Sequence, residues 1–225
     1  MKLTRRETLA AAGAIGIAAQ AKAATSTQGV VDVAVIGAGV FGAWSAWHLK
    51  KTGLSVALID QYSPGHARSS SGGESRVIRV SYGGDLLYSS MAVDSLAQWD
   101  ALSQRQSQPI LHKVGVLWFS TDDDASAKQS LEWLRASGLG RWEGDAAALR
   151  ARFQQMRFAD NESGFIETGT GALIAGRGVQ AVVADARLEA VRGKAESPKR
   201  LQNGFYEVAG ITARSLVYAC GPWLP

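Results

Sequence analysis

A strand, a glycine-rich turn and a helix follow one another between residues 31 and 51, and this run constrains the fold more than any other feature. Residues 31–36 are a short β-branched run of the kind that forms a parallel strand buried on both faces. Gly37, Gly39 and Gly42 follow at once in a G-x-G-x-x-G pattern. The first glycine permits a tight turn, the second lets the backbone approach a pyrophosphate, and the third lets the helix pack on the strand. The run therefore predicts a dinucleotide-binding unit.

The residues that follow complete this unit. Ala46 and Leu49 would face the sheet, and Gly53 is a plausible end of the helix. A second apolar strand at 55–59 ends in Asp60. A carboxylate at this place can accept hydrogen bonds from the ribose hydroxyls of an adenosine, and it would repel the 2′-phosphate of NADP. Asp60 does not separate NAD from FAD.

The composition is that of an ordinary globular chain. Of the 225 residues, 46% are hydrophobic and only 20% charged, a balance that can bury enough apolar surface to offset chain entropy. A single cysteine, Cys220, excludes an internal disulfide and any multi-cysteine metal site in this sequence. Because Cys220 follows an apolar strand, we expect an inert thiol. His48, His66 and His112 lie far apart without the spacing of metal ligands, so we expect no metal site.

Residues 1–24 have the pattern of an export signal. A basic start with Arg5 and Arg6 precedes an apolar stretch and the small residues of a cleavage box at 21–23. The adjacent arginines, with Leu9 behind them, resemble a twin-arginine signal, although Thr8 stands where an aromatic residue is commoner. We expect the twin-arginine export machinery as a partner and a periplasmic location. The alternative is a basic terminus with no targeting role.

The net charge of the chain is concentrated in this segment. Residues 1–23 hold four of the 24 basic residues and one of the 20 acidic ones, so the remainder has a net charge of only +1. We therefore expect no nucleic-acid partner, because such binding needs a basic surface. The apolar stretch is too short and too glycine-rich to span a bilayer as a stable helix, so we expect no stable membrane insertion.

A long loop at 61–83 favours FAD over NAD. It is rich in small residues and arginine, whereas a nicotinamide dehydrogenase usually proceeds quickly to its next helix. The stretch Ser-Ser-Gly-Gly-Glu-Ser-Arg-Val-Ile-Arg at 70–79, with Tyr82-Gly83 after it, resembles the glycine/D-amino-acid oxidase group of FAD flavoproteins. The nearest resemblance within this group is to monomeric sarcosine oxidase, N-methyltryptophan oxidase and pipecolate oxidase. The resemblance fades after about residue 190 and returns at 216–223.

The resemblance implies FAD as the cofactor and an α/β fold. It implies a Rossmann-type FAD-binding domain, a parallel sheet with helices on its faces, joined to part of an α+β substrate domain. The FAD-binding domain would be discontinuous, at 30–107 and 170–225, and the partial substrate domain would occupy 108–169. The implied reaction oxidises a secondary amine or N-methyl amino acid by hydride transfer to flavin, with oxygen as acceptor and peroxide as product. The implied partners are a small amine that bears a carboxylate, and oxygen.

The resemblance also implies the site residues. Arg76 would lie beside the flavin ring, and Arg79 would bind the substrate carboxylate, to which its planar fork can donate two parallel hydrogen bonds. The alternative is that both arginines are solvated loop charges. Relatives often have histidine near this point, where this chain has Ser-Gly at 71–72, so the role of those imidazoles does not carry over. The implied cofactor-binding residues are Gly37, Gly39, Val40, Phe41, Gly42, Asp60, Ser70, Ser71, Ser75, Arg76, Gly221 and Trp223.

Apolar periodicity predicts the remaining elements. Residues 85–103 should form an amphipathic helix whose core stripe comprises Tyr88, Ala92, Leu96, Trp99 and Leu102. We expect further helices ending near 136, at 144–153 and at 178–190, strands within 110–120 and 164–175, a hairpin at Asn203-Gly204 and a final strand at 215–219. Relatives carry an apolar strand after the helix at 178–190. Only 186–191 could supply it here, which suggests a deletion.

Members of the family continue beyond the position of Pro225 with a long C-terminal half. We therefore expect this chain to correspond to the N-terminal half of such an enzyme. Three interpretations are left open by the sequence. The chain is a flavin enzyme, whole or as part of a longer product; or it is a truncated, non-catalytic FAD-binding remnant; or, less favoured, it is an NAD-dependent Rossmann enzyme.

The export interpretation predicts the effect of a double substitution. Replacing Arg5 and Arg6 with lysine should block passage of the folded, cofactor-loaded protein to the periplasm, because a tightly bound cofactor requires export of a folded chain. Fractionation of cells that express the variant measures this. Normal periplasmic accumulation would contradict the interpretation.

Overall fold

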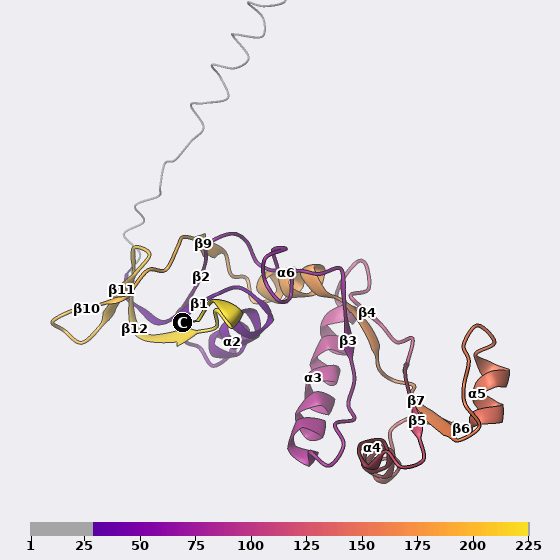
Figure 1. Cartoon of the computed structure of the whole chain (residues 1–225). Helices are drawn as coiled ribbons and strands as arrows, with labels where there is room; N and C mark the ends of the chain where they lie inside the picture. Colours follow the sequence, from indigo (N-terminus) through magenta and orange to yellow (C-terminus); the bar gives the residue numbers. More distant parts are fainter. Residues whose placement is uncertain (1–28, 225) are drawn as a thin grey trace, which may run out of the picture.

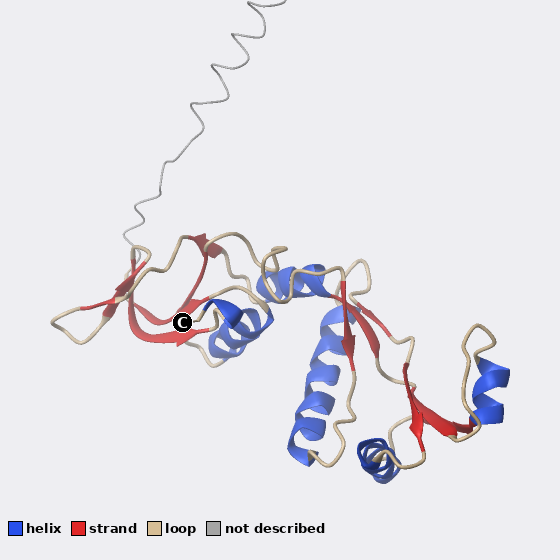
Figure 2. Ribbon diagram, in the orientation of Figure 1, coloured by secondary structure: helices blue, strands red, loops and turns tan. Residues whose placement is uncertain are grey.

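Three β-sheets and their helices form residues 29–224, which the computed structural model describes. A six-stranded sheet lies at one end of the chain's elongated shape and two three-stranded sheets lie toward the other (Figure 1). Helices lie between the six-stranded sheet and the other two and continue beside those two sheets (Figure 2). The expected export signal at 1–24 lies outside the described residues.

The six-stranded sheet contains the predicted dinucleotide-binding unit. In spatial order its strands are β10 (Lys199–Arg200), β11 (Tyr206–Val208), β12 (Ile211–Tyr218), β1 (Val31–Ile36), β2 (Val56–Asp60) and β9 (Ala190–Arg192). β12, β1, β2 and β9 are parallel, and the β10–β11 hairpin continues the sheet in antiparallel direction. The predicted α/β fold is confirmed, with a sheet that is mixed because the hairpin joins its edge.

The two faces of this sheet are covered differently. Val33, Val35 and Leu58 point to one face, where they form a core with α2 (Val40–Lys51), α3 (Leu86–Gln104) and α6 (Ala175–Asp185). Ala34 and Ile36 alternate with them and pack on the other face against Val208 of β11 and Ile211 of β12. This alternation is what a central strand buried on both sides requires.

Two glycines at the turn between β1 and α2, Gly37 and Gly42, leave no room for a side chain. Gly37 has φ +104°, and a Cβ there would lie 2.4 Å from the carbonyl oxygen of Ala219. A Cβ on Gly42 would lie 1.8 Å from the carbonyl oxygen of Gly37. The turn, the start of α2 and the end of β12 are therefore in backbone contact, as the glycine pattern predicts.

The other two sheets are antiparallel and adjoin each other. One has the order β3 (Ser75–Ile78), β8 (Gly171–Ile174) and β4 (Leu111–His112), and the other β5 (Val116–Thr121), β7 (Glu162–Glu167) and β6 (Arg141–Asp145). Three residues, 168–170, separate β7 from β8 and so join the two sheets. The apolar run at 110–120 is thus split between them. The domain boundaries at 107–108 and 169–170 stay predictions.

Aspartates begin the three helices of this part. Asp85 precedes α3, Asp124 precedes α4 (Ala125–Ala136), and Asp145 precedes α5 (Ala146–Arg152). Each carboxylate accepts a hydrogen bond from the backbone N–H three residues later. This satisfies one of the free donors at each helix start and explains why the helices begin there.

Three sequence expectations are wrong in detail. Tyr88 was expected in the core stripe of α3 but is 59% exposed, whereas Trp99 and Leu102 are buried. The helix expected at 178–190 is α6, which begins at Ala175 and ends at Asp185 because Arg187 turns the chain with φ +51°. The strand that seemed to be deleted is present as β9, which pairs with β2 over three residues.

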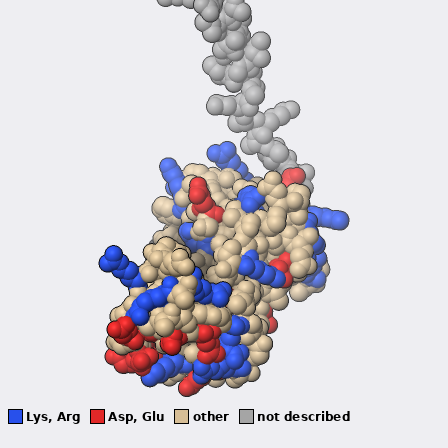
Figure 3. All heavy atoms as spheres, turned by 90° about the vertical axis from the view of Figure 1, so that its right-hand side faces the viewer, with Lys and Arg blue, Asp and Glu red and all other residues tan. Residues whose placement is uncertain are grey.

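Charged side chains of both signs lie on the surface. Lysine and arginine side chains are interspersed with aspartate and glutamate on the face shown in Figure 3. None of the helices between residues 29 and 224 is both long and apolar enough to span a bilayer.

The contact at Gly42 predicts a loss of stability. Gly42→Ala should destabilise the fold by about 1–3 kcal/mol, because backbone must move to admit the new methyl group. Urea unfolding of the purified variant measures this. Gly169→Ala is the matched control, since a Cβ there meets nothing within 4 Å. Equal midpoints for Gly42→Ala and the unmodified chain would contradict the prediction.

Candidate dinucleotide site

A cavity of about 570 Å³ opens where the parallel strands end. Its wall includes Ile36 and Gly37 after β1, Asp60 at the end of β2, and residues 219–223 after β12. α6 and α3 contribute Val179 and Trp99. The carboxyl edge of a parallel sheet is the usual place for a nucleotide in an α/β fold, and the volume is in the range of cofactor and ligand sites.

The first turn of α2 faces this cavity. Gly39 is the residue before the helix and offers no side chain to cap it. Ser71 from the loop that follows β2 supplies a cap, because its Oγ accepts a hydrogen bond of 3.0 Å from Val40 N. The first backbone N–H groups of a helix have no partner within the helix and attract anions. A phosphate group would be held here.

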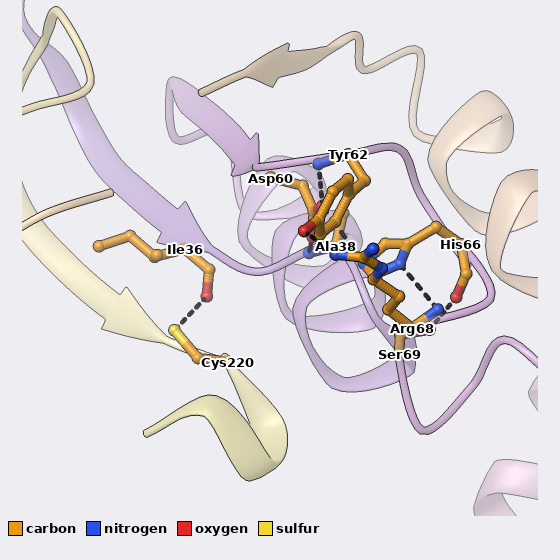
Figure 4. Close-up of polar contacts among 8 residues, drawn as sticks. All are labelled: Ile36, Ala38, Asp60, Tyr62, His66, Arg68, Ser69 and Cys220. Atoms are coloured by element: carbon orange, nitrogen blue, oxygen red, sulfur yellow. Dashed lines mark hydrogen bonds and ion pairs between the residues drawn. The ribbon is translucent and has the colours of Figure 1, made fainter. Parts of the chain in front are cut away.

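Asp60 lies at the other side of the turn. Its Oδ2 accepts a hydrogen bond of 2.7 Å from Ala38 N, and its Oδ1 accepts one of 2.8 Å from Tyr62 N (Figure 4). These contacts fix the carboxylate at the cavity wall. Each oxygen of a carboxylate has two acceptor positions, so capacity remains for a ribose hydroxyl.

His66 also lies in the cavity wall, although the sequence analysis gave it no role. Its Nε2 is 3.5 Å from Asp60 Oδ1, and its Nδ1 accepts a hydrogen bond of 3.1 Å from Arg68 N. Its ring is 4.7 Å from that of Tyr62, measured between centroids. The Pro64-Gly65 turn is the available sequence signal, because Gly65 N donates to Ala38 O at 3.1 Å and returns the loop to the strand end.

Cys220 is part of the same wall but has the properties of an unreactive thiol. Burial raises its pKa above the ordinary value, and Sγ lies 3.5 Å from Ile36 O, to which it donates. A raised pKa keeps the thiol protonated at neutral pH, and the thiolate is the reactive form.

Most residues predicted to bind the cofactor meet at this cavity. Those that line it are Gly37, Gly39, Val40, Phe41, Asp60, Ser70, Ser71, Arg76, Gly221 and Trp223. Gly42 and Ser75 do not line it: Gly42 packs against Gly37, and Ser75 is an exposed residue of β3. The cofactor contacts of all these residues stay predictions.

Arg76 lies in the cavity wall and hydrogen-bonds to the loop after β2. Its Nη1 donates to Ser75 O at 2.8 Å and its Nη2 to Ser70 O at 2.5 Å. Ser70 adjoins Ser71, which caps α2. The Arg76 side chain therefore supports the same loop that shapes the phosphate end of the cavity.

Arg79 lies elsewhere, because residues three apart on an extended chain point to opposite faces. It is not among the cavity-lining residues. Its guanidinium lies 4.5 Å from the ring centroid of Tyr82 and 4.8 Å from that of Trp118. Within residues 29–224 no carboxylate lies within 4.0 Å of it. The two predicted catalytic arginines are thus at separate places.

The part of the chain that the structure describes shows no candidate metal centre. No group of three or more histidine, cysteine, aspartate or glutamate side chains in it could hold a metal ion.

The chain matches a known protein family over most of its length. The model of the family described as FAD dependent oxidoreductase matches residues 32–225. Peroxisomal sarcosine oxidase of Mus musculus is 29% identical over 198 residues, which cover 85% of this chain and 50% of that protein. N-methyl-L-tryptophan oxidase of Salmonella newport (strain SL254) is 32% identical over 147 residues, 63% of this chain and 38% of that protein. The chain spans about half, or less, of the length of these relatives.

Solved structures share the fold. L-proline dehydrogenase from P. horikoshii aligns with a TM-score of 0.73 at 16% identity, over 86% of this chain and 54% of that one. Fructosyl peptide oxidase from E. terrenum aligns with a TM-score of 0.70 at 20% identity, over 87% of this chain and 50% of that one.

The residues at the cavity fit a flavin dinucleotide. The turn at Gly37 holds the backbone where no side chain could stand, the first residues of α2 line the cavity, and Asp60 offers acceptor positions. The sequence pattern at this turn fits either FAD or NAD, and the family match identifies the cofactor as FAD.

Because there is free space at Gly39, a small substitution there should affect cofactor binding without affecting the stability of the fold. A Cβ at Gly39 would meet only Ser71 Oγ, at 3.7 Å, an ordinary contact. Gly39→Ala should therefore keep the unfolding midpoint but weaken FAD binding about tenfold or more, since the methyl group would stand where the pyrophosphate approaches. Titration of the apoprotein with FAD measures this, with Gly169→Ala as control. Unchanged FAD affinity would contradict the pyrophosphate assignment.

Proposed function

The chain belongs to the family of FAD dependent oxidoreductases, and from this premise we propose that it serves the oxidation of a small amine or amino acid that bears a carboxylate. Its relatives include a sarcosine oxidase and an N-methyl-L-tryptophan oxidase, both named for N-methyl amino acids. The proposed substrate class is therefore a secondary amine or N-methyl amino acid, and the proposed acceptor is oxygen, which yields peroxide.

The chemistry of the proposed reaction comes from the cofactor. FAD, when bound, supplies the acceptor for a hydride from the carbon next to the amine, so that the product is an imine that hydrolyses. The protein contributes binding and orientation. The first turn of α2 would hold the pyrophosphate and Asp60 the ribose. Arg76 would hold the loop at 70–71 and lie beside the flavin ring, since it spans from β3 to the cavity wall.

The substrate proposal rests on the contacts of the Arg79 side chain. Its guanidinium is stacked on Tyr82 and Trp118, and it makes no ion pair within residues 29–224. Contact with two aromatic rings holds the guanidinium in place without using its N–H groups to pair with a carboxylate. A planar, positioned fork is suited to bind a carboxylate with two parallel hydrogen bonds. We propose that this is where the carboxylate of the substrate binds.

The location of this activity is a separate proposal. The twin-arginine pattern at 5–6 supports export of the folded, FAD-loaded protein to the periplasm.

The activity is tested with the purified protein in its FAD-loaded form. The proposal predicts flavin absorbance, its loss when sarcosine is added without oxygen, and peroxide release when oxygen is admitted. A protein that binds FAD but shows none of these reactions with secondary amines would support the non-catalytic alternative. A protein that retains no FAD would contradict the cofactor assignment as well.

Arg79→Ala tests the carboxylate site without turnover. Methoxyacetate has the shape of sarcosine but no amine to oxidise, and its binding should perturb the flavin spectrum. The variant should bind it about ten- to hundredfold more weakly, a loss of ~1.5–3 kcal/mol for a charge-assisted contact, with unchanged FAD content. Arg79→Lys should recover only part, because one ammonium cannot reproduce the fork.

The control for this experiment is Arg214→Ala. Arg214 also stacks on an aromatic ring, 5.0 Å from the centroid of Phe205, but on the hairpin side of the sheet. It should bind methoxyacetate normally. Equal affinity in Arg79→Ala and Arg214→Ala would remove Arg79 from the substrate site.

A further inference from the structure

Glu167, the last residue of β7, is a charged residue type that is almost completely buried. Only 1% of its surface is exposed, and it ranks among the largest fully buried side chains of the described chain. A buried carboxylate is costly unless hydrogen bonds replace its lost water. The contacts that replace this water show what Glu167 does.

Three N–H groups donate to the Glu167 carboxylate. Val80 N donates to Oε2 at 2.8 Å, Ser81 N donates to Oε1 at 3.2 Å, and Trp118 Nε1 donates to Oε1 at 2.8 Å. All three partners are donors, which matches a carboxylate that only accepts. Hydrogen bonds to a charged acceptor are among the stronger ones in proteins.

These donors surround Arg79. Val80 and Ser81 are the two residues that follow it in the chain, and the Trp118 ring lies beneath its guanidinium. Tyr82, the other ring that contacts the guanidinium, comes next along the same backbone. The Glu167 carboxylate thus holds both the backbone that follows Arg79 and the Trp118 ring that the Arg79 side chain contacts.

We propose that Glu167 is a positioning residue for the Arg79 guanidinium, and so determines how well the site accepts a substrate carboxylate. The proposal rests on the proposed function of Arg79. Glu167 itself would not touch the substrate, because its oxygens are already bonded to the protein and are buried. Without it, Trp118 and the 80–82 backbone could shift relative to each other, and the guanidinium would lose its fixed plane.

The loop has a second attachment that allows Glu167 to be altered without loss of the fold. The Val80 side chain is 1% exposed and packs in an apolar cluster with Leu134 and Phe165. Glu167→Gln keeps the size of the side chain but replaces one acceptor oxygen with an NH₂ group. In either orientation of the amide, that group meets an N–H donor of Val80 or of Trp118 and Ser81.

Glu162→Gln is the matched control on the same strand. Glu162 begins β7, and its Oε2 accepts a hydrogen bond of 2.7 Å from Ala159 N just before the strand. The chemical change is identical, but the contact is exposed and far along the strand from the Glu167 carboxylate. It should leave the affinity for methoxyacetate unchanged.

The experiment compares the FAD-loaded protein with its Glu167→Gln and Glu162→Gln variants. Glu167→Gln should weaken methoxyacetate binding about tenfold, equivalent to ~1.4 kcal/mol, with unchanged FAD affinity. The backbone amides of residues 80–82 should exchange hydrogen faster in this variant, and those of β1 and β2 at the unmodified rate. This exchange measurement needs no turnover.

Two results would overturn the proposal. One is unchanged methoxyacetate affinity in Glu167→Gln while Arg79→Ala loses affinity, which would show that Glu167 does not position the guanidinium. The other is an equal loss of FAD and methoxyacetate affinity in Glu167→Gln, which would show general structural support only. Unchanged affinity in Arg79→Ala itself would instead reject the proposed function of Arg79.

Trp118→Phe decides the question if Glu167→Gln does not fold. It keeps an aromatic ring beneath Arg79 but removes the N–H that donates to Glu167. It should weaken methoxyacetate binding severalfold with unchanged FAD affinity. Full affinity in Trp118→Phe would overturn the proposal.

Discussion

The backbone contact between β1, α2 and β12 is the constraint on which the candidate site depends. At Gly37 and Gly42 a side chain would overlap main-chain oxygens, at 2.4 Å from Ala219 O and 1.8 Å from Gly37 O respectively. Because these positions carry no side chain, the first turn of α2 can lie at the carboxyl end of the sheet and face the cavity. Asp60 is fixed at the same edge by the backbone N–H of Ala38. Because Gly37 and Gly42 have no side chains, the end of the cavity at which the phosphate is predicted to bind can form.

The loop after β2 leads from this cavity to the antiparallel sheets. Ser71 caps α2, Arg76 bonds to Ser70 O and extends from β3, and Arg79 follows the end of that strand. A single segment thus connects the phosphate end, the proposed flavin side and the proposed carboxylate site. Glu167 fixes the far end of the segment by two hydrogen bonds, from Val80 N and Ser81 N, and accepts a third from Trp118 of β5. The proposed cofactor and substrate contacts are in this way linked by one covalent path, which is held near one end by its contact with α2 and at the other by Glu167 of β7.

Features with local causes were predictable from the sequence, and those with distant causes were not. The βαβ unit, the aspartate before α3 and the hairpin at Asn203-Gly204 follow from residues adjacent in the chain, and all three are present. The end of α6 was missed because it depends on the positive φ of Arg187, and β9 was missed because pairing with β2 holds its three residues. Glu167 and His66 were missed because their partners lie far away in sequence or after a turn: Val80 is 87 residues from Glu167. Arg76 and Arg79 were predicted to have separate roles, and the structure places Arg76 in the cavity wall and Arg79 beside Trp118.

The central claim is that the cavity at the end of β1 and β2 holds FAD with its pyrophosphate at the first turn of α2. A crystal structure of the FAD-loaded protein tests this most directly. The account predicts phosphate oxygens within hydrogen-bond distance of the N–H groups at the start of α2, and ribose hydroxyls at the Asp60 carboxylate. A flavin bound outside this cavity, or a pyrophosphate that makes no contact with the α2 turn, would contradict it.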